Sequence, residues 1–305
     1  MDNKPKLLLW GIGREYNRSL NMLKYWEGQG AIEIVGVTDK NIPEVDGIDG
    51  WKVYKTTEIH RADMDYCLVM SDKFFLEVWE ELQVLGVEKE KILSSRILSI
   101  PYFSWEQYLK IYHSDLSIIC NNCVGGILYQ TLGLEYKSPC KNLAIPDESF
   151  LKLIKDLKFY MSLELKFQRW QRDPHSGKEF PVMTLDDVEI CCNHDVSVDE
   201  ARNKWNQRKK KINYENILLM MYVENDETGR RFLATGDQRK VLFVPETSKL
   251  EGHDVFHLKL FPGQEEFWET VNSSASLGKN SCNYRILDML NGKQTYRNTT
   301  GEKGI

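Results

Sequence analysis

The chain has 305 residues, with 40 lysines and arginines against 45 aspartates and glutamates, a formal net charge of -5. Charged residues make up 28% and hydrophobic residues 42%, which indicates a core-forming protein whose length favours two domains. The charge balance favours no nucleic-acid partner, and no apolar run reaches the roughly 18–20 residues of a transmembrane segment. Because seven cysteines occur without a signal-peptide pattern, we expect a reduced, cytoplasmic protein.

The first unit, expected at residues 1–114, alternates short apolar strands with helices. The run KLLLW at residues 6–10 is typical of a buried parallel strand, and it ends at a tight Gly-x-Gly turn. Such alternation predicts an α/β fold with a Rossmann-like parallel sheet. Further strands are expected at residues 32–37 and 66–70, with helices at 17–26, 74–85 and 105–112.

The second unit, expected at residues 115–291, has the same α/β character. Ser197 followed by Glu200 forms a capping box that opens a helix to about residue 211, and Pro146 with two acids opens one to about residue 170. The polar residues 292–305 are expected to form a flexible tail. A third helix is expected at 127–132, and strands at 116–120, 188–192, 216–223, 241–244 and 255–260.

Gly11 and Gly13 lie where a dinucleotide-binding unit begins, between a strand and a helix. Glycines there let the backbone approach a phosphate, and Asp39, at the end of the second strand, could hold ribose hydroxyls. Tyr16 replaces the third glycine of the fingerprint, and its bulk would crowd a pyrophosphate. Two interpretations stay open: glycines that only form the turn, or a site whose cofactor is a nucleotide or nucleotide-sugar.

Cys123 is the candidate nucleophile of the second unit. It follows a strand and precedes a helix, where the unpaired amides of the first turn favour the thiolate. A cysteine nucleophile needs a base, and His194, directly after the strand VEICC, is the candidate, with Asp195 to orient its ring. Asn122 and the Cys123 amide could donate hydrogen bonds to a developing oxyanion.

Small and polar neighbours of Cys123 are candidate substrate contacts. Asn121 could supply a further hydrogen-bond donor, and Gly125 and Gly126 leave room for a substrate. The alternative is structural: a small buried cysteine preceded by two turn-forming asparagines. Cys120 and Cys123 form a Cys-x-x-Cys pair, but no second pair has zinc spacing, so no metal site is expected.

The helix at residues 197–211 is rich in cations, which a solvated face near a helix C-terminus explains. Trp205 and Arg208 nevertheless share one stripe with Ala201 and Ile212. A buried arginine requires a carboxylate or a phosphate as its partner. Trp205 and Arg208 are therefore candidate substrate-binding residues for an anionic substrate, and an internal ion pair of Arg208 is the alternative.

The stretch from Ser117 to about Val244 resembles an uncharacterised bacterial family described as exopolysaccharide biosynthesis proteins, from capsule gene clusters. This family usually has serine where Cys120 stands, which favours Cys123 as the relevant thiol. The order of strand, cysteine, helix, later histidine and basic helix also resembles a group described as papain-like cysteine peptidases. The resemblance rests on Ser117 to Gly126, Tyr129, Gly133 to Pro139, His194, Glu200-Ala201, Lys204-Trp205, Arg208 and Ile212-Asn213.

These resemblances imply a cysteine-dependent acyl transfer or hydrolysis on a sugar or glycan substrate. The first unit resembles nucleotide-sugar-binding Rossmann modules, and peripheral association with polysaccharide-assembly machinery is a further expectation. Two rival functions stay open. One is a glycosyltransferase without a covalent intermediate, although the pair Asp186-Asp187 lacks the spacing of the common Asp-x-Asp signature. The other is a nucleotide-sugar sensor or scaffold without catalysis.

Overall fold

A computed structural model describes residues 4–174, 176–259 and 285–293. The chain divides into two compact units, Met1–Glu106 and Gln107–Ile305, which meet within helix α3 (Trp105–Tyr112). The sequence pattern places this boundary at residue 114 instead. Each unit has a parallel sheet with helices between its strands, which confirms the predicted α/β class.

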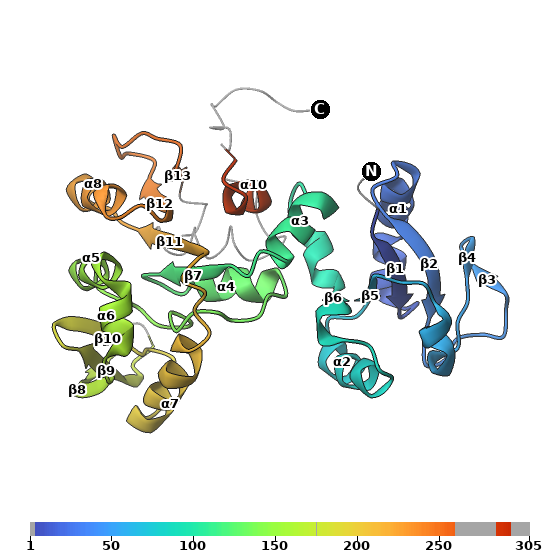
Figure 1. Ribbon diagram of the computed structural model, residues 1–305, viewed down its shortest axis with the longest axis horizontal. Coiled ribbons are helices and arrows are strands. Elements are labelled where there is room, and N and C mark those ends of the chain that lie inside the picture. The colour runs from blue at the N-terminus through green and yellow to red at the C-terminus, as the bar shows by residue number, and fades with distance from the viewer. Residues whose placement is uncertain (1–3, 175, 260–284, 294–305) are drawn as a thin grey trace. The chain divides into compact units, whose positions relative to one another are not determined.

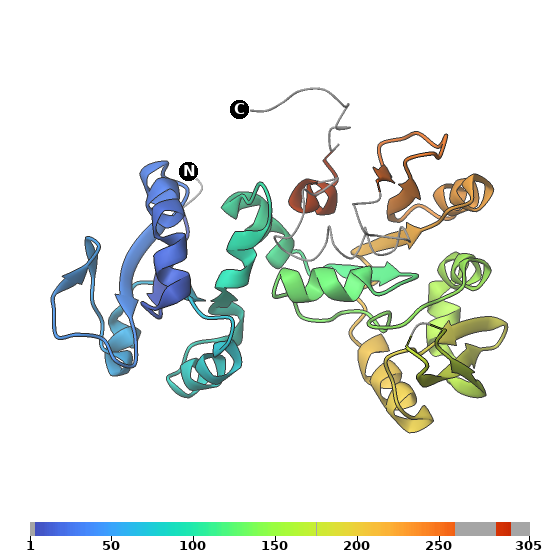
Figure 2. The ribbon, with the colours of Figure 1, turned by 180° about the vertical axis from the view of Figure 1, so that it is seen from behind.

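The first unit contains a four-stranded parallel sheet in the order β2-β1-β5-β6. A short hairpin extends beside β2 (Figure 2). The strands of the sheet are β1 (Lys6–Trp10), β2 (Glu33–Thr38), β5 (Tyr66–Val69) and β6 (Ile92–Ser94), and those of the hairpin are β3 (Gly47–Ile48) and β4 (Trp51–Lys52). The helices are α1 (Arg14–Gly28) and α2 (Phe75–Val84), with 3-10 turns at Thr56–Arg61, Lys89–Lys91 and Ser95–Ser99.

The strand β1 lies inside the first sheet, which explains its composition. Leu7, Leu8 and Leu9 are completely buried, as expected for a parallel strand covered on both faces. The strand order changes direction at β1, since β2 lies on one side and β5 on the other. The carboxyl ends of β1 and β5 therefore form the switch point at which open α/β sheets usually bind ligands.

The second unit contains two sheets. The main sheet has four parallel strands in the order β13-β12-β11-β7, and the smaller sheet has three antiparallel strands in the order β10-β9-β8. The main strands are β7 (Ser117–Cys120), β11 (Ile217–Tyr222), β12 (Arg239–Pro245) and β13 (Val255–Leu258). The smaller sheet contains β8 (Lys166–Arg172), β9 (Glu179–Leu185) and β10 (Val188–Cys191). The helices are α4 (Val124–Thr131), α5 (Asp147–Lys155), α6 (Leu157–Ser162), α7 (Val198–Lys209), α8 (Asp226–Ala234) and α10 (Ile286–Leu290).

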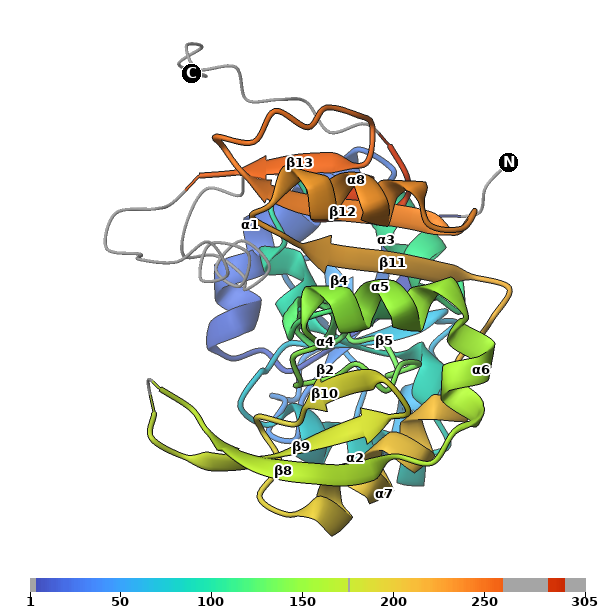
Figure 3. The same cartoon turned by 90° about the vertical axis from the view of Figure 1, so that its left-hand side faces the viewer.

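One hydrophobic core joins the two sheets of the second unit, whose strands are labelled in Figure 1. Helices α5 and α8 lie on the same face of the main sheet (Figure 3). The rings of Phe150 and Phe232, one from each helix, stack with 6.3 Å between their centroids. Strand β10 is tied to the connection ahead of α5 by a bridge between Ala144 and Cys191. The two sheets therefore share one hydrophobic interior instead of forming separate domains.

The helix expected at residues 146–170 is wrong in its second half. Asp156 interrupts it, because its backbone leaves the helical region (φ -141°, ψ 67°) and its carboxylate accepts a hydrogen bond of 3.1 Å from the Phe159 amide. Residues from Lys166 onward form the hairpin β8–β9. Phe167 and Trp170 have helical spacing, but a bulge after Phe167 brings their rings to 5.7 Å within the strand.

Other differences concern elements that the sequence pattern does not reveal. Strand β9 and helices α8 and α10 are not among the expected elements. Helix α8 begins after Asn225, whose side chain accepts hydrogen bonds from the Glu227 and Thr228 amides. The expected strand end at residue 260, and the expected tail from residue 294 onward, lie outside the described residues.

Candidate functional site

The turn after β7 places Cys123 at the start of α4. Cys123 is the N-cap residue of this helix and is half-buried. Asn122 supplies the capping side chain, since its Oδ1 accepts hydrogen bonds from the Val124 amide at 2.9 Å and from the Cys120 thiol at 3.3 Å. Cys123 therefore lies at the positive end of α4. The side-chain oxygen of Asn122 thus caps the helix. The role of Asn122 as a hydrogen-bond donor to an oxyanion stays a prediction.

Asn121 is buried and joins three segments of the second unit. Its Nδ2 donates to the Asp147 carboxylate at 3.3 Å and to the Tyr222 carbonyl at 3.1 Å, and its Oδ1 accepts from the Tyr222 amide at 3.1 Å. Burial raises the pKa of Asp147, while the hydrogen bond from Asn121 acts in the opposite direction. The amide group of Asn121 thus has a structural role with two protein acceptors, and the substrate contact expected from the sequence stays a prediction.

Gly125 and Gly126 are buried by protein atoms. A Cβ atom at Gly125 would lie 3.1 Å from the Cβ of Cys120, and one at Gly126 would lie 3.3 Å from the Cγ of Lys141. Both glycines are thus closely packed: α4 lies against β7 on one side and against the following loop on the other. Their expected role in admitting a substrate stays a prediction.

Lys141 lies beside the first turn of α4, and the sequence pattern does not single it out. Its Nζ lies 3.2 Å from the centroid of the Tyr136 ring. Burial, together with the positive charges of Arg208 and Lys204, lowers the pKa of Lys141 to about 8. No motif or spacing marks this lysine, because its unusual environment comes from side chains more than 60 residues away.

Arg208 reaches the same loop from α7. Its Nη1 donates a hydrogen bond of 3.2 Å to the Lys141 carbonyl, and within the described residues it forms no ion pair with a carboxylate. The internal ion pair considered for Arg208 is thus not formed there, and contact with an anionic substrate stays a prediction. Trp205 is only 2% exposed and belongs to the hydrophobic core, and the substrate contact expected for it stays a prediction.

His194 and Asp195 follow β10, as the sequence pattern suggests. Among the described residues, no hydrogen bond or ion pair joins their side chains. His194 is exposed, and its ring has no hydrogen-bond partner in the described part of the chain. The Asp195 carboxylate binds the Lys204 ammonium at 2.6 Å, and Glu200 binds it at the same distance. Asp195 is thus engaged in an ion pair, and its role in orienting the imidazole stays a prediction.

One loop connects the surroundings of Cys123 with those of His194. The Ile145 amide donates to the Asn121 carbonyl at 2.8 Å, and the preceding residue, Ala144, exchanges two hydrogen bonds with Cys191. The loop thus ties the carboxyl end of β7 to the end of β10. A direct interaction between the Cys123 thiol and the His194 ring stays a prediction.

Other thiols of the second unit are shielded from solvent. Cys120, Cys140 and Cys192 are buried, and burial raises the pKa of each to about 12. Cys191 is half-buried, and burial raises its pKa to about 11. A thiol with so high a pKa is a poor nucleophile near neutral pH. None of these four thiols therefore competes with Cys123 as the candidate nucleophile.

In the first unit, the turn after β1 is held by the protein itself. Gly11 has φ +103°, a conformation that favours glycine, and its amide donates to the Thr38 carbonyl at 2.7 Å. Asp39 accepts hydrogen bonds from the amides of Ile12 at 3.0 Å and Asn41 at 2.9 Å. Gly13 is the N-cap of α1 and has no side-chain cap. Asp39 therefore fixes the turn, and cofactor binding by these three residues stays a prediction.

Tyr16, which replaces the third glycine, points away from this turn. Its side chain is only 2% exposed, and its hydroxyl donates to the Asp49 carboxylate at 2.7 Å. The ring packs edge-on against Trp51 at 6.3 Å between centroids. The tyrosine thus holds the β3–β4 hairpin against α1, and the expected crowding of a pyrophosphate does not follow from its position.

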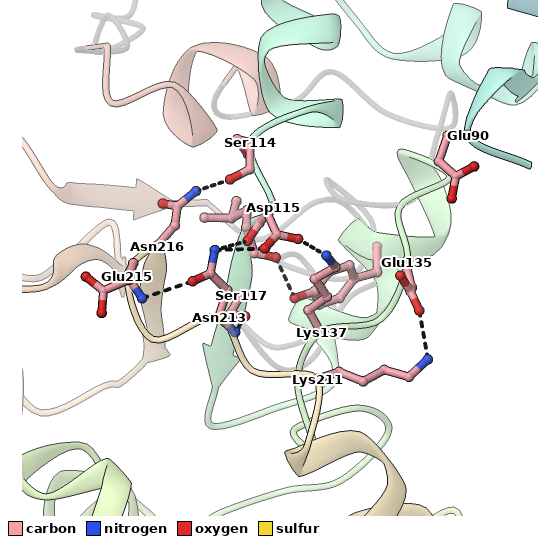
Figure 4. Close-up of polar contacts among 12 residues, drawn as sticks. Glu90, Ser114, Asp115, Ser117, Glu135, Lys137, Lys211, Asn213, Glu215 and Asn216 are labelled. Carbon is pink, nitrogen blue, oxygen red and sulfur yellow. Dashed lines mark hydrogen bonds and ion pairs between the residues drawn. The ribbon is translucent and has the colours of Figure 1, made fainter.

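Figure 4 shows polar contacts at the amino end of β7, opposite to the end that leads to Cys123. Asn213 donates from its amide to Ser117 Oγ at 2.8 Å and from Nδ2 to Asp115 Oδ2 at 2.9 Å. Lys137 forms an ion pair with Asp115. Asn213, Lys137 and Ser117 all belong to the motif behind the family resemblance, and here they link the chain before β7 with the chain before β11. Their observed role is structural.

The fold and this site together define a class: an α/β protein of two units with a cysteine at the carboxyl edge of its second parallel sheet. The chain belongs to the family described as a domain of unknown function, DUF1919, which matches residues 95–291. The N-terminal part matches a family described as C2185-like, N-terminal, over residues 3–93.

A bacterial relative is similar to this chain over more than half its length. It is a protein of Haemophilus influenzae described as an uncharacterized protein, 29% identical over 174 residues that cover 56% of this chain and 81% of the relative. Among the described residues, none of the helices has the length and apolar character that crossing a bilayer requires.

Proposed function

We propose that this chain is an enzyme of bacterial polysaccharide biosynthesis that transfers or hydrolyses an acyl group on an anionic sugar or glycan, with Cys123 as the nucleophile. The position of Cys123 at the N-cap of α4 carries the proposal. Parallel α/β sheets gather their functional groups at the carboxyl ends of strands, and Cys123 follows the carboxyl end of β7. The resemblance to capsule proteins supplies the polysaccharide context.

The proposed reaction proceeds through a thioester. The Cys123 sulfur attacks the acyl carbonyl, the carbon–oxygen bond to the sugar breaks, and the sugar hydroxyl leaves with a proton. A second hydroxyl or water then takes the acyl group and restores the thiol. The proton requires a base. His194 is the proposed base, since its exposed ring is not held elsewhere by the described residues, and Lys141, with a pKa of about 8, is the other candidate.

An anionic substrate follows from the cations beside α4. Lys141 and Arg208 approach each other across a backbone hydrogen bond, and Arg208 has no carboxylate partner among the described residues. The two positive charges repel each other, so the binding of an anion next to both would be favourable. The N-terminal amides of α4 add to this attraction.

The first unit would hold the nucleotide part of a nucleotide-sugar. Its switch point lies at Gly11, and the α1 terminus at Gly13 has no side-chain cap that would compete with a phosphate. In this proposal the protein acts in the cytoplasm, where nucleotide-sugars are made, and associates peripherally with the polysaccharide-assembly machinery.

Alkylation of the thiols tests the nucleophile directly. Iodoacetamide at about pH 6.5 should label Cys123 faster than free glutathione, because the end of a helix favours the thiolate. Cys191 provides the internal control, since it is also half-buried but has its pKa raised by burial and should react slowly. Peptide mass spectrometry over time separates the two sites. Labelling of Cys123 no faster than that of glutathione would remove the proposed nucleophile.

A second candidate is a glycosyltransferase or sugar-nucleotide-binding protein that forms no covalent intermediate. Arg208 has no carboxylate partner among the described residues, which favours this function because an arginine beside a helix terminus suits a diphosphate. Titration calorimetry with a nucleotide-sugar panel distinguishes the two functions. Binding that is lost in Arg208→Gln but unchanged in Cys123→Ala, together with slow labelling of Cys123, supports this second function.

A further inference from the structure

A cavity of about 350 Å³ lies at the amino ends of β12 and β13, next to the residues that follow α10. Because the main sheet is parallel, this edge is opposite to the one that carries Cys123. The cavity is thus separate from the site discussed above. Its size is in the range of about 300–1,000 Å³ that small-molecule sites occupy. Its lining contains Arg239, Lys240, Val241, His253, Asp254, Phe256, Met289, Asn291, Gly292 and Lys293.

Positive charge dominates this lining. Arg239, Lys240 and Lys293 contribute cations, and the single acid of the lining, Asp254, is paired with His253 at 2.8 Å. None of the three cations has an ion pair with a carboxylate in the part of the chain that the structure describes. With three cations and one carboxylate, the lining therefore has a surplus of positive charge.

Two of these cations are fixed by backbone carbonyls. Lys240 is only 9% exposed, and its Nζ donates to the Gly236 carbonyl at 2.7 Å. Arg239 Nη2 donates to the Leu290 carbonyl at 2.5 Å, which ties the start of β12 to the end of α10. Burial lowers the pKa of Arg239 and of Lys240, although the negative charge of Asp254 opposes the effect. The charged form of such a partly desolvated cation is stabilised when an anion binds next to it.

Part of the cavity wall is apolar. Phe256 is 7% exposed and Met289 is 2% exposed, and both line the cavity together with Val241. A site built only for a free inorganic ion would not need an apolar wall. Charged and apolar walls together suit a molecule with a phosphate at one end and an organic group at the other.

We propose that this cavity binds a phosphorylated small molecule, with Arg239 and Lys293 contacting the phosphate and Phe256 contacting the organic part. Guanidinium groups match phosphate oxygens in bidentate geometry, and ammonium groups add a point charge. This site lies on the other edge of the sheet from Cys123, so the inference does not depend on the proposed function.

Calorimetric titration of the full chain with inorganic pyrophosphate and with uridine diphosphate tests the site. We expect saturable binding, weakened about tenfold in Arg239→Gln and in Lys293→Gln, because a charge-assisted hydrogen bond to phosphate is lost. Arg230→Gln is the matched control. Arg230 is exposed on α8, pairs only with Glu227 among the described residues and does not line the cavity, so its replacement should leave binding unchanged.

The two ligands distinguish what the site recognises. Equal affinity for both indicates that the phosphate groups alone are bound, while tighter binding of uridine diphosphate indicates that the apolar wall contacts the organic part. Arg239→Gln also removes the contact with Leu290, so Lys293→Gln, which breaks no side-chain hydrogen bond of the described residues, gives the independent readout. No binding of either ligand at about millimolar concentration, or binding unchanged in both variants, overturns the proposal.

Discussion

Asn121 shows how one polar side chain can hold a functional turn in place. Its amide satisfies both backbone groups of Tyr222 at the end of β11, and it also reaches the first turn of α5 at Asp147. The Cys123 turn begins directly after this residue. The position of this turn relative to the rest of the sheet therefore depends on partly buried hydrogen bonds.

Replacement of Asn121 by alanine should destabilise the second unit by about 2 kcal/mol, because the backbone groups of Tyr222 lose their buried partners. Urea denaturation followed by circular dichroism measures the change. Asn203→Ala, on an exposed position of α7, is the control and should change stability by about 0.5 kcal/mol or less. Equal effects of the two substitutions would contradict the bridging role of Asn121.

Lys141 makes stability depend on pH in a direction that can be derived from its pKa. The pKa falls from 10.5 to about 8 in the folded protein. Between these values the unfolded chain keeps the proton while the folded protein releases it, so the contribution of Lys141 to stability rises with pH. Below about pH 8 both states are protonated, and the folded protein carries a poorly solvated charge.

The stability of the wild-type chain should therefore increase relative to that of Lys141→Met as the pH rises from about 8 to about 10. Urea midpoints of the two proteins across this range measure the trend, and the difference removes other titrating groups. Lys210→Met, at an exposed position, should show no such trend. A constant difference between wild type and Lys141→Met would mean that the lysine is ordinarily solvated.

At the scale of elements, the first turn of α4 is packed unequally on its two sides. The space next to Gly125 is occupied by Cys120 and Ile118 of β7, whose positions the sheet determines. The space next to Gly126 is occupied by the side chains of Asn142 and Lys141, which can rotate away. The same substitution should therefore have different effects at two adjacent positions.

We expect Gly125→Ala to destabilise the protein by about 1–3 kcal/mol, because the new methyl group would crowd a strand. Gly126→Ala should change stability by less than about 1 kcal/mol, since the gain in helix propensity offsets modest crowding. Thermal unfolding of the two variants measures this difference, and each variant is the other's control. A larger loss at Gly126 would show that the loop beside α4 is more rigid than the strand.

The elements that the sequence pattern predicts correctly are those with a local physical cause. Apolar runs formed β1, β7 and β11, and Ser197 caps α7 by accepting a hydrogen bond of 3.1 Å from the Glu200 amide, as the capping box predicts. The error at β8 has a local cause as well. All seven residues of β8 are exposed at the edge of a sheet, so no alternation of burial marks the strand.

At the scale of the whole molecule, each unit has its own sheet and its own core. The cluster around Leu8, Trp10 and Val69 belongs to the first unit, and a separate cluster fills the second. The first turn of α3 contributes to the first unit, where Trp105 contacts Trp26 and Phe103 at ring distances of 6.0 and 5.1 Å. A fragment that keeps Trp105 should therefore retain the packing of this unit.

A fragment of residues 1–106 should fold alone and unfold in one cooperative transition. A sigmoidal urea curve with the same midpoint by tryptophan fluorescence and far-ultraviolet circular dichroism is the expected result. The fragment with Trp105→Ala is the control for the aromatic cluster and should have a lower midpoint. Gradual unfolding of the unmodified fragment would show that the first unit needs the second for its stability.

The sequence alone determined the α/β class, the position of Cys123 between a strand and a helix, and the burial of Cys120. These features follow from residues close together in the chain, since hydrophobic periodicity and helix termini are local. The tertiary structure decided that Asp195 pairs with Lys204, that Arg208 meets the loop at Lys141, and that a cationic cavity forms beside α10. Such contacts depend on which distant segments pack into the same core, because those segments determine how buried a residue is and which charges lie near it.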